Sequence, residues 1–274
     1  MRTQAEKAAA FRALHERPGA FIIPNPWDEG TARLCAHAGF RALATTSAGF
    51  ANTLGRLDYG VTRGEMLAHC ATIVDATNLP VSADLEAGFG ATPDDVAETY
   101  RLAGAAGLVG ASIEDSSPDP DRPVRDMAEA TERVAAAVDA VRGLPFRFTL
   151  TARAENFLHG RKNLDDTIRR LQAYAAAGAD VLYAPGLGRA EDIRAVVQAM
   201  GKPVNVLAGF ADPPLSRAEL AAAGVARISL GSHLTRVALG ALDRALKEMA
   251  TDGTFGFIAA GAPYPDLGAA FAPD

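Results

Sequence analysis

The chain has 274 residues, of which 49% are hydrophobic and 7% aromatic, and its formal net charge is −6. It carries no basic stripe with interleaved aromatic residues, which argues against a nucleic-acid partner. Every long apolar stretch is broken before the roughly 18 residues that a membrane span needs. The first residues contain no apolar signal core, so we expect a cytoplasmic protein with no membrane contact.

Short apolar runs alternate with helical patterns along the whole chain. The first residues, MRTQAEKAAAFRALHERPG, predict an extra N-terminal helix. Strands are predicted over residues 20–25, 42–46, 81–84, 109–114, 147–153, 181–183, 204–207 and 228–230. Helices are predicted over residues 29–38, 63–77, 93–106, 127–141, 165–177, 190–200, 217–223 and 232–250.

Start and stop signals support these boundaries. Thr92 is a suitable helix cap that is followed by a first-turn proline and two acids. Four alanine-rich helix ends are each followed by a glycine and then a strand, the arrangement of a left-handed turn: Gly39, Gly107, Gly178 and Gly224. The alternation predicts an α/β protein, a (β/α)8 TIM barrel that forms one domain over residues 1–274. An open doubly wound sheet is the alternative, but no G-x-G-x-x-G opens the first helix.

Residues 251–274 are rich in Gly, Ala and Pro. We expect a C-terminal extension that lies on the barrel or on a neighbouring subunit, and a mobile tail is the alternative. The two cysteines, Cys35 and Cys70, fall in separate helical patterns. We therefore expect two buried core residues rather than a disulfide or a thiolate metal site.

Polar residues collect at the carboxyl ends of the first five predicted strands, where barrels of this type place their active sites. The groups are Pro24-Asn25-Pro26, Thr45-Thr46-Ser47, Asp84-Leu85-Glu86, Glu114-Asp115 and Thr151-Ala152-Arg153. Asp84 and Glu86 are two residues apart, so in extended backbone both side chains would face the same way. Glu114 would approach them from the next strand.

Three neighbouring carboxylates without His or Cys favour a hard cation, Mg2+ or alternatively Mn2+. The other interpretation is a cluster that caps neighbouring helices and pairs with Arg101 or Arg153. Arg153 itself predicts a clamp for a substrate carboxylate, or else a salt bridge to Glu155 or Glu114. The hydroxyls of the second group could hold the other end of an acidic substrate: Thr45, Thr46 and Ser47.

The run ADLEAGFG resembles the D-x-D-x-G-[FY]-G motif of the isocitrate lyase/phosphoenolpyruvate mutase superfamily. Further matches follow in the order and spacing of that superfamily and extend the resemblance over residues 20–250. They are PNPWDEGTARL, TTSAGF, LGRLD, IED and TARAENF.

The resemblance implies roles for individual residues. Asp84 matches the acid that binds Mg2+ directly, and Glu86 and Glu114 match acids that act at the same ion from farther out. Asp58 matches an acid that approaches the metal waters from the loop after the second strand. Thr46 and Ser47 match the segment that cradles a substrate carboxylate, and Arg153 matches the clamp. The resemblance also implies a homo-oligomer, a tetramer or dimer, whose last helix is swapped between barrels.

The departures from the family are specific. The lyases carry K-K-C-G-H after the fourth strand, whereas here Asp115 is followed by SSPDPDRP, and residues 115–123 contain no Cys, Lys or His. Ser116 stands where phosphonopyruvate-processing members have lysine. Pro185 and Leu207 stand where the lyases have Glu and Asn. The chain therefore resembles a 2-methylisocitrate lyase or carboxyphosphonoenolpyruvate mutase that lacks the catalytic cysteine loop. The nearest substitute bases are Glu155, Tyr59 and His159.

From these residues we expect a Mg2+-dependent lyase that acts on a small 2-oxo or 2-hydroxy acid through a pyruvate-enolate-type intermediate, by C–C cleavage or decarboxylation. Oxaloacetate, an alkylmalate or a methylisocitrate-like acid would be suitable substrates. A phosphonopyruvate hydrolase or mutase is one alternative. A barrel that binds 2-oxo acids without catalysis is another.

Overall fold

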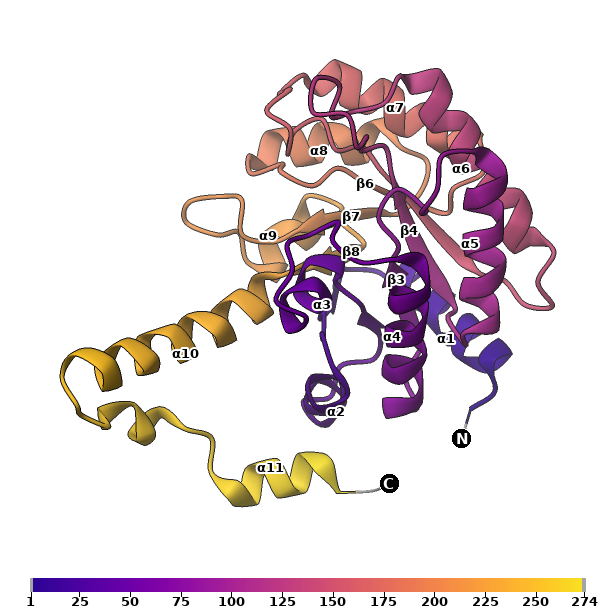
Figure 1. Ribbon diagram of the computed structural model, residues 1–274. Helices are drawn as coiled ribbons and strands as arrows, with labels where there is room; N and C mark the ends of the chain where they lie inside the picture. The colour runs from indigo at the N-terminus through magenta and orange to yellow at the C-terminus, as the bar shows by residue number, and fades with distance from the viewer. Residues whose placement is uncertain (1, 273–274) are drawn as a thin grey trace.

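A computed structural model describes residues 2–272 and shows eight parallel strands that alternate with helices (Figure 1). Hydrogen bonding runs in the order β1-β8-β7-β6-β5-β4-β3-β2, so the sheet curls round into a nearly closed barrel. The predicted TIM barrel is confirmed. The strands are β1 Phe21–Ile23, β2 Leu43–Ala44, β3 Val81–Asp84, β4 Gly110–Glu114, β5 Thr149–Arg153, β6 Val181–Tyr183, β7 Val204–Leu207 and β8 Arg227–Ser229.

The seam between β1 and β2 is closed by few contacts in the described chain. The backbone N–H of Ala44 donates to the carbonyl of Pro24 at 3.0 Å. Asn25 adds its side chain: the amide Nδ2 donates to the carbonyl of Thr45 at 2.9 Å, and Oδ1 accepts from the backbone of Leu230 at 2.9 Å. One side chain thus joins the ends of β1, β2 and β8.

The helices that follow the strands confirm most predicted boundaries within two residues. Thr92 caps α5 as predicted, with its hydroxyl accepting from the backbone of Asp95 at 3.2 Å. The four predicted turn glycines all have positive φ. These helices are α2 Glu29–His37, α4 Arg63–Ala76, α5 Pro93–Ala105, α6 Met127–Arg142, α7 Leu164–Ala176, α8 Ala190–Ala199, α9 Arg217–Ala222 and α10 His233–Thr251.

Helix α3, Ser47–Thr53, is an element that the sequence pattern did not predict. Its residues, SAGFANT, are small or polar and show no apolar periodicity, so tertiary context rather than pattern makes them helical. Thr46 caps the helix by accepting from the backbone of Gly49 at 3.2 Å. Strand β2 is correspondingly short, and the predicted strand over residues 42–46 is wrong at its end.

Helix α1, Gln4–His15, packs against the amino ends of the strands and covers the bottom of the barrel. Phe11 is fully buried and lies so close to Gly110 of β4 that a Cβ there would be 2.8 Å from its ring. His15 donates from Nδ1 to the carbonyl of Phe11 at 3.0 Å. Burial, and to a smaller extent the charge of nearby Arg227, lower the pKa of His15 to about 3, so the imidazole is neutral at pH 7.

The chain after the barrel forms α10, the short helix η1 Gly256–Ala260 and α11 Tyr264–Phe271. Figure 1 shows α10 projecting away from the barrel, and α11 returns to contact α2. The predicted extension therefore contacts the barrel at α2, and its exchange between subunits stays a prediction. No helix in residues 2–272 combines the length and hydrophobicity needed to cross a bilayer. Helix α10 exposes several apolar side chains, of which Leu239, Leu242, Leu246 and Met249 share one face and Val237 lies on the opposite side.

Candidate active site

A cavity of about 190 Å³ opens among the carboxyl ends of the strands. It is the place at which the sequence predicted a site, and all but one of the predicted site residues line it. Among its lining residues are Asn25, Thr45, Thr46, Ser47, Asp58, Tyr59, Asp84, Glu114, Arg153, Glu155, Tyr183, Asn205, Arg227 and Ser229.

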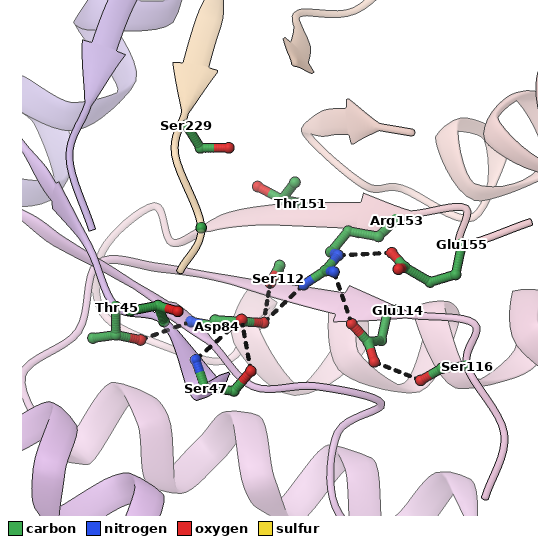
Figure 2. Close-up of polar contacts among 12 residues, drawn as sticks. Thr45, Ser47, Asp84, Ser112, Glu114, Ser116, Thr151, Arg153, Glu155 and Ser229 are labelled. Carbon is green, nitrogen blue, oxygen red and sulfur yellow. Dashed lines mark hydrogen bonds and ion pairs between the residues drawn. The ribbon is translucent and has the colours of Figure 1, made fainter. Parts of the chain in front are cut away.

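Arg153 lies between three carboxylates (Figure 2). Its Nη1 is 2.9 Å from Oδ1 of Asp84, its Nη2 is 3.0 Å from Oε2 of Glu114, and its Nε is 2.8 Å from Oε1 of Glu155. The side chain also packs over the ring of Tyr183, 5.2 Å from the centroid. Burial alone would lower the pKa of Arg153, but the three acids raise it well above its ordinary value. The salt-bridge interpretation of Arg153 is thus correct, and its role as a substrate clamp stays a prediction.

Asp84 is held by the loop that follows β2. Its backbone N–H donates to the hydroxyl of Thr45 at 2.9 Å, and its Oδ2 accepts from the hydroxyl and the backbone N–H of Ser47 at 3.0 and 3.3 Å. Thr45 and Ser47 therefore orient an acid, and Thr46 uses its hydroxyl to cap α3. In this arrangement the hydroxyls of the three predicted substrate-binding residues bond to groups of the protein itself.

Asp58 reaches the same place from the loop after α3. The hydroxyl of Ser47 is 3.0 Å from Oδ1 of Asp58 and 3.0 Å from Oδ2 of Asp84, so the two acids share one hydroxyl. Since that hydroxyl has a single proton, it can donate to only one of them at a time. Burial raises the pKa of Asp58, and the charges of Asp84 and then Glu114 raise it further. Only the family resemblance had indicated this residue.

Glu114 is buried and accepts hydrogen bonds from two hydroxyls. Tyr59 donates from its phenol at 2.6 Å, and Ser116 donates from the first turn of the following loop. The backbone of Tyr59 has a φ of 61°, a left-handed conformation that is uncommon for a residue with a large side chain. Burial raises the pKa of the phenol, and the neighbouring Glu114 raises it further. The phenol is therefore protonated and acts as a donor.

Glu86 is the predicted site residue that does not line the cavity. The prediction assumed extended backbone, but β3 ends at Asp84 and Glu86 has a φ of 50°, so the alternation of strand faces does not apply. Arg133 of α6 holds this turn by donating to backbone carbonyls, among them that of Gly90 at 3.0 Å. Glu86 is buried, and among residues 2–272 its Oε1 has no hydrogen-bond partner.

Glu155 is fully buried at the wall of the cavity. Its backbone N–H donates to Oδ1 of Asp115 at 2.8 Å, and Asp115 is held in turn by Arg170 at 3.0 Å and Tyr174 at 2.7 Å. Burial raises the pKa of Glu155, and the Arg153 guanidinium opposes that rise. The other suggested base, His159, is exposed and does not line the cavity.

The cysteines take no part in this site. Cys70 is buried in α4, and burial raises its pKa to about 12. Cys35 is only partly buried, so the prediction of two core cysteines holds fully for Cys70 alone.

The loop over residues 115–126 forms a small hairpin in which Ser116 bridges to Val124.

The donor set was compared with the needs of a magnesium ion. No three Asp, Glu, His or Cys side chains within residues 2–272 lie close enough to hold a bare ion by themselves. Magnesium usually keeps several of its waters, however, so acids that are farther apart can hold its hydrated form. The unpartnered Oε1 of Glu86 and its pKa, which burial and then the charges of Asp84, Asp58 and Glu114 raise to about 8, indicate a deficit of positive charge. The residues therefore fit a hydrated cation.

Several polar residues of the cavity escaped the sequence-based prediction, among them Asn205 and Arg227. Both lie inside strands, and only polar residues at strand ends were considered as candidates. The signal that could have found Arg227 is a charged residue that interrupts an apolar run, GVARISLG. A buried charge inside a strand needs a physical reason.

Comparisons with known proteins place the chain among enzymes of carboxylic acids. The family model described as phosphoenolpyruvate phosphomutase matches residues 11–250. A solved structure of a "putative lyase/mutase" from Burkholderia cenocepacia J2315 is 60% identical, with a TM-score of 0.95 and coverage of 98% of this chain and 97% of that one. The 2-methylisocitrate lyase of Escherichia coli K12 is 30% identical over 79% of this chain and 75% of its own length. The 2,3-dimethylmalate lyase of Eubacterium barkeri is 30% identical over 79% of this chain and 77% of its own length.

Proposed function

Because the chain belongs to the isocitrate lyase/phosphoenolpyruvate mutase superfamily, we propose that it is a Mg2+-dependent lyase of a small 2-oxo or 2-hydroxy di- or tricarboxylic acid. One observation carries the proposal: Asp58, Asp84 and Glu114 face one cavity together with the guanidinium of Arg153. A cation bound by these acids could bind one end of an anionic substrate, and the neighbouring guanidinium could bind another part of it.

The geometry of the site suggests a role for each of its residues. When bound, the cation would supply positive charge that stabilises an enolate oxygen. Asp84, Asp58 and Glu114 would hold it, and the buried Glu86 would lose its proton more readily beside the bound cation. Ser47 and Thr45 keep Asp84 oriented, and Arg153 keeps the acids together in the resting site. Glu155 is the group best suited to move a proton, since burial raises its pKa toward neutrality and Asp115 fixes its backbone.

Metal removal tests the proposal directly. Purified protein with added Mg2+ is expected to consume oxaloacetate or an alkylmalate and to form a 2-oxo acid, which a coupled dehydrogenase assay detects. EDTA should abolish this activity, and an excess of Mg2+ should restore it. Mn2+ should substitute for Mg2+, because both ions prefer oxygen ligands. Turnover that continues unchanged in EDTA would overturn the magnesium assignment.

A phosphonopyruvate hydrolase or mutase is a second candidate, favoured by the matching family model. Ser116, at the position where such members have lysine, donates its hydroxyl to Glu114 and leaves no cation there. Release of phosphate from phosphonopyruvate (hydrolase) or its conversion to phosphoenolpyruvate (mutase), measured beside the lyase assay, distinguishes these reactions from the lyase.

We also propose that the protein assembles as a homo-oligomer in the cytoplasm, through the exposed apolar face of α10. Leu242 is 53% exposed and Leu246 is 51% exposed, although both are apolar residues of a long helix. Burying such a face against a second copy is favourable. Light scattering after size exclusion should give a mass of two or four chains, and Leu246→Asp should shift the protein toward the monomer. A wild-type monomer would contradict the assembly.

A further inference from the structure

The interior of the barrel beneath the acids is polar. In most (β/α)8 barrels the inward positions hold branched apolar side chains that fill the centre. Here the inward positions of several strands carry small hydroxyl residues, an amide and a guanidinium, all of them buried. The polar residues of this layer that line the cavity are Ser82, Ser112, Asn205, Arg227 and Ser229.

The layer is connected to the mouth by the register of the strands. Glu114 pairs with Arg153 across β4 and β5, Arg153 with Tyr183, Tyr183 with Asn205, and Asn205 with Arg227 on β8. Because barrel strands are tilted, a hydrogen-bonded row of this kind winds from one end of the barrel toward the other. The row therefore begins at the acid cluster and ends at Arg227, which lies at the floor beside His15.

Within residues 2–272, the hydrogen-bond partners of Arg227 are all neutral. Its Nε donates to Oδ1 of Asn205 at 2.8 Å, its Nη2 donates to the hydroxyl of Thr151 at 3.0 Å, and its Nη1 is 3.5 Å from Nε2 of His15. His15 is neutral at pH 7, as its lowered pKa requires. In the described part of the chain no carboxylate lies within ion-pair distance of Arg227, although the residue is only 5% exposed.

The two guanidinium groups of the cavity therefore differ in charge balance. Arg153 directs its three nitrogens at three carboxylates, so its charge is more than neutralised. The charge of Arg227 is not compensated, and burial lowers its pKa to about 10, which still leaves it protonated at pH 7. An unpaired buried charge is costly, and folded proteins rarely keep one without a use. The binding of an anion would account for both the charge and the polar lining.

We propose that Arg227, together with Asn205 and Ser229, forms an anion subsite at the floor of the cavity that takes the second carboxylate of a dicarboxylic acid. This inference rests on the proposed function for the other end of the acid, which lies at the mouth near Asp84 and Arg153. The subsite selects diacids over monoacids of the same length. It also makes β8, rather than the loop that follows β4, the element that sets substrate class.

Binding measurements test the subsite without any turnover. Calorimetry on the full-length protein with Mg2+ compares succinate with butyrate, which has the same chain length and one carboxylate fewer. Wild type is expected to bind succinate more tightly, and Arg227→Met should weaken succinate binding on the order of 10²-fold, as expected when one partner of a buried charge pair is removed. Butyrate binding should not change. Oxalate, which is two carbons shorter than succinate, is expected to occupy the mouth alone and should bind wild type and variant alike.

Two further variants separate the subsite from a structural role. Methionine is apolar and nearly as long as arginine, so removing an unpaired buried charge should leave the free protein at least as resistant to urea as wild type. Arg227→Lys keeps the charge but loses the fork, and should weaken succinate binding about 10-fold, a loss in the range of one charged hydrogen bond. Arg217→Met is the matched control, since Arg217 of α9 donates to the carbonyl of Ala20 outside the cavity; it should bind succinate as wild type does.

The outcomes keep the two proposals apart. Arg227-dependent succinate binding in a protein that cleaves no acid would support the subsite and count against the lyase. Cleavage of oxaloacetate or an alkylmalate, with succinate binding unchanged in Arg227→Met and Arg227→Lys, would support the lyase and overturn the subsite. Equal binding of succinate and butyrate by wild type would also overturn it.

Discussion

Alanine at position 84 is expected to lower kcat/KM of the proposed lyase on the order of 10³-fold, the scale seen when a main electrostatic group of an active site is removed. Asp84 accepts from Ser47, pairs with Arg153 and faces the cavity, so it is the acid through which the mouth residues are connected. Without it the site loses a negative charge for the cation. Initial rates over a range of Mg2+ concentrations measure the loss.

Asp94→Ala is the matched control for Asp84→Ala. Asp94 is an exposed acid in the first turn of α5, the helix that follows the same strand, and it does not line the cavity. The control should retain wild-type activity and the wild-type requirement for Mg2+. If Asp84→Ala and Asp94→Ala keep the same activity, Asp84 has no role in the reaction and the metal proposal loses its main ligand.

Methionine at position 153 is expected to reduce the free energy of unfolding by about 3–5 kcal/mol, the cost of leaving buried charges without their partner. Arg153 is the shared partner of Asp84, Glu114 and Glu155, and the last two are buried. Urea unfolding without Mg2+ at pH 8 measures the loss. Arg101→Met is the control, because its pair with Glu98 is exposed and such pairs contribute at most about 1 kcal/mol.

The loss of unfolding free energy in Arg153→Met should depend on pH, and the direction of that dependence can be predicted. Burial already raises the pKa of Glu155 and Arg153 opposes that rise, so removing Arg153 raises the pKa further. A carboxyl whose pKa is higher in the folded than in the unfolded protein is destabilised as pH rises through that range and relieved as pH falls. The difference from wild type should therefore be smaller at pH 5 than at pH 8. A difference that grows toward acid pH would show that Arg153 does not stabilise these carboxylates.

The barrel could be predicted because its signals are local. Helix caps such as Thr92 and turn glycines such as Gly178 mark where each unit begins and ends, and β-strand runs between them are apolar. Helix α3 could not be predicted, since its small and polar residues become helical through the loop that surrounds Asp84 rather than through their own pattern.

The site was predictable where side chains leave the ends of strands in regular geometry. Asp84, Glu114 and Arg153 do so, and they meet. Glu86 fails that rule because its backbone is left-handed two residues beyond the end of the strand. Arg227 could not be predicted for a different reason. It lies within a strand, and its place in the cavity can be recognised only when the register of the neighbouring strands is known.

The seam between β1 and β2 gives the ring of strands one joint that is unlike the others. Elsewhere adjacent strands are joined by ladders of main-chain hydrogen bonds. At this seam the side-chain amide of Asn25 instead bonds to the backbones of Thr45 and Leu230. Thr45 in turn holds the backbone of Asp84. The side chain of Asn25 therefore helps to close the barrel between β1, β2 and β8. Through Thr45, it also connects this closure to Asp84, the residue on which the proposed cation site depends.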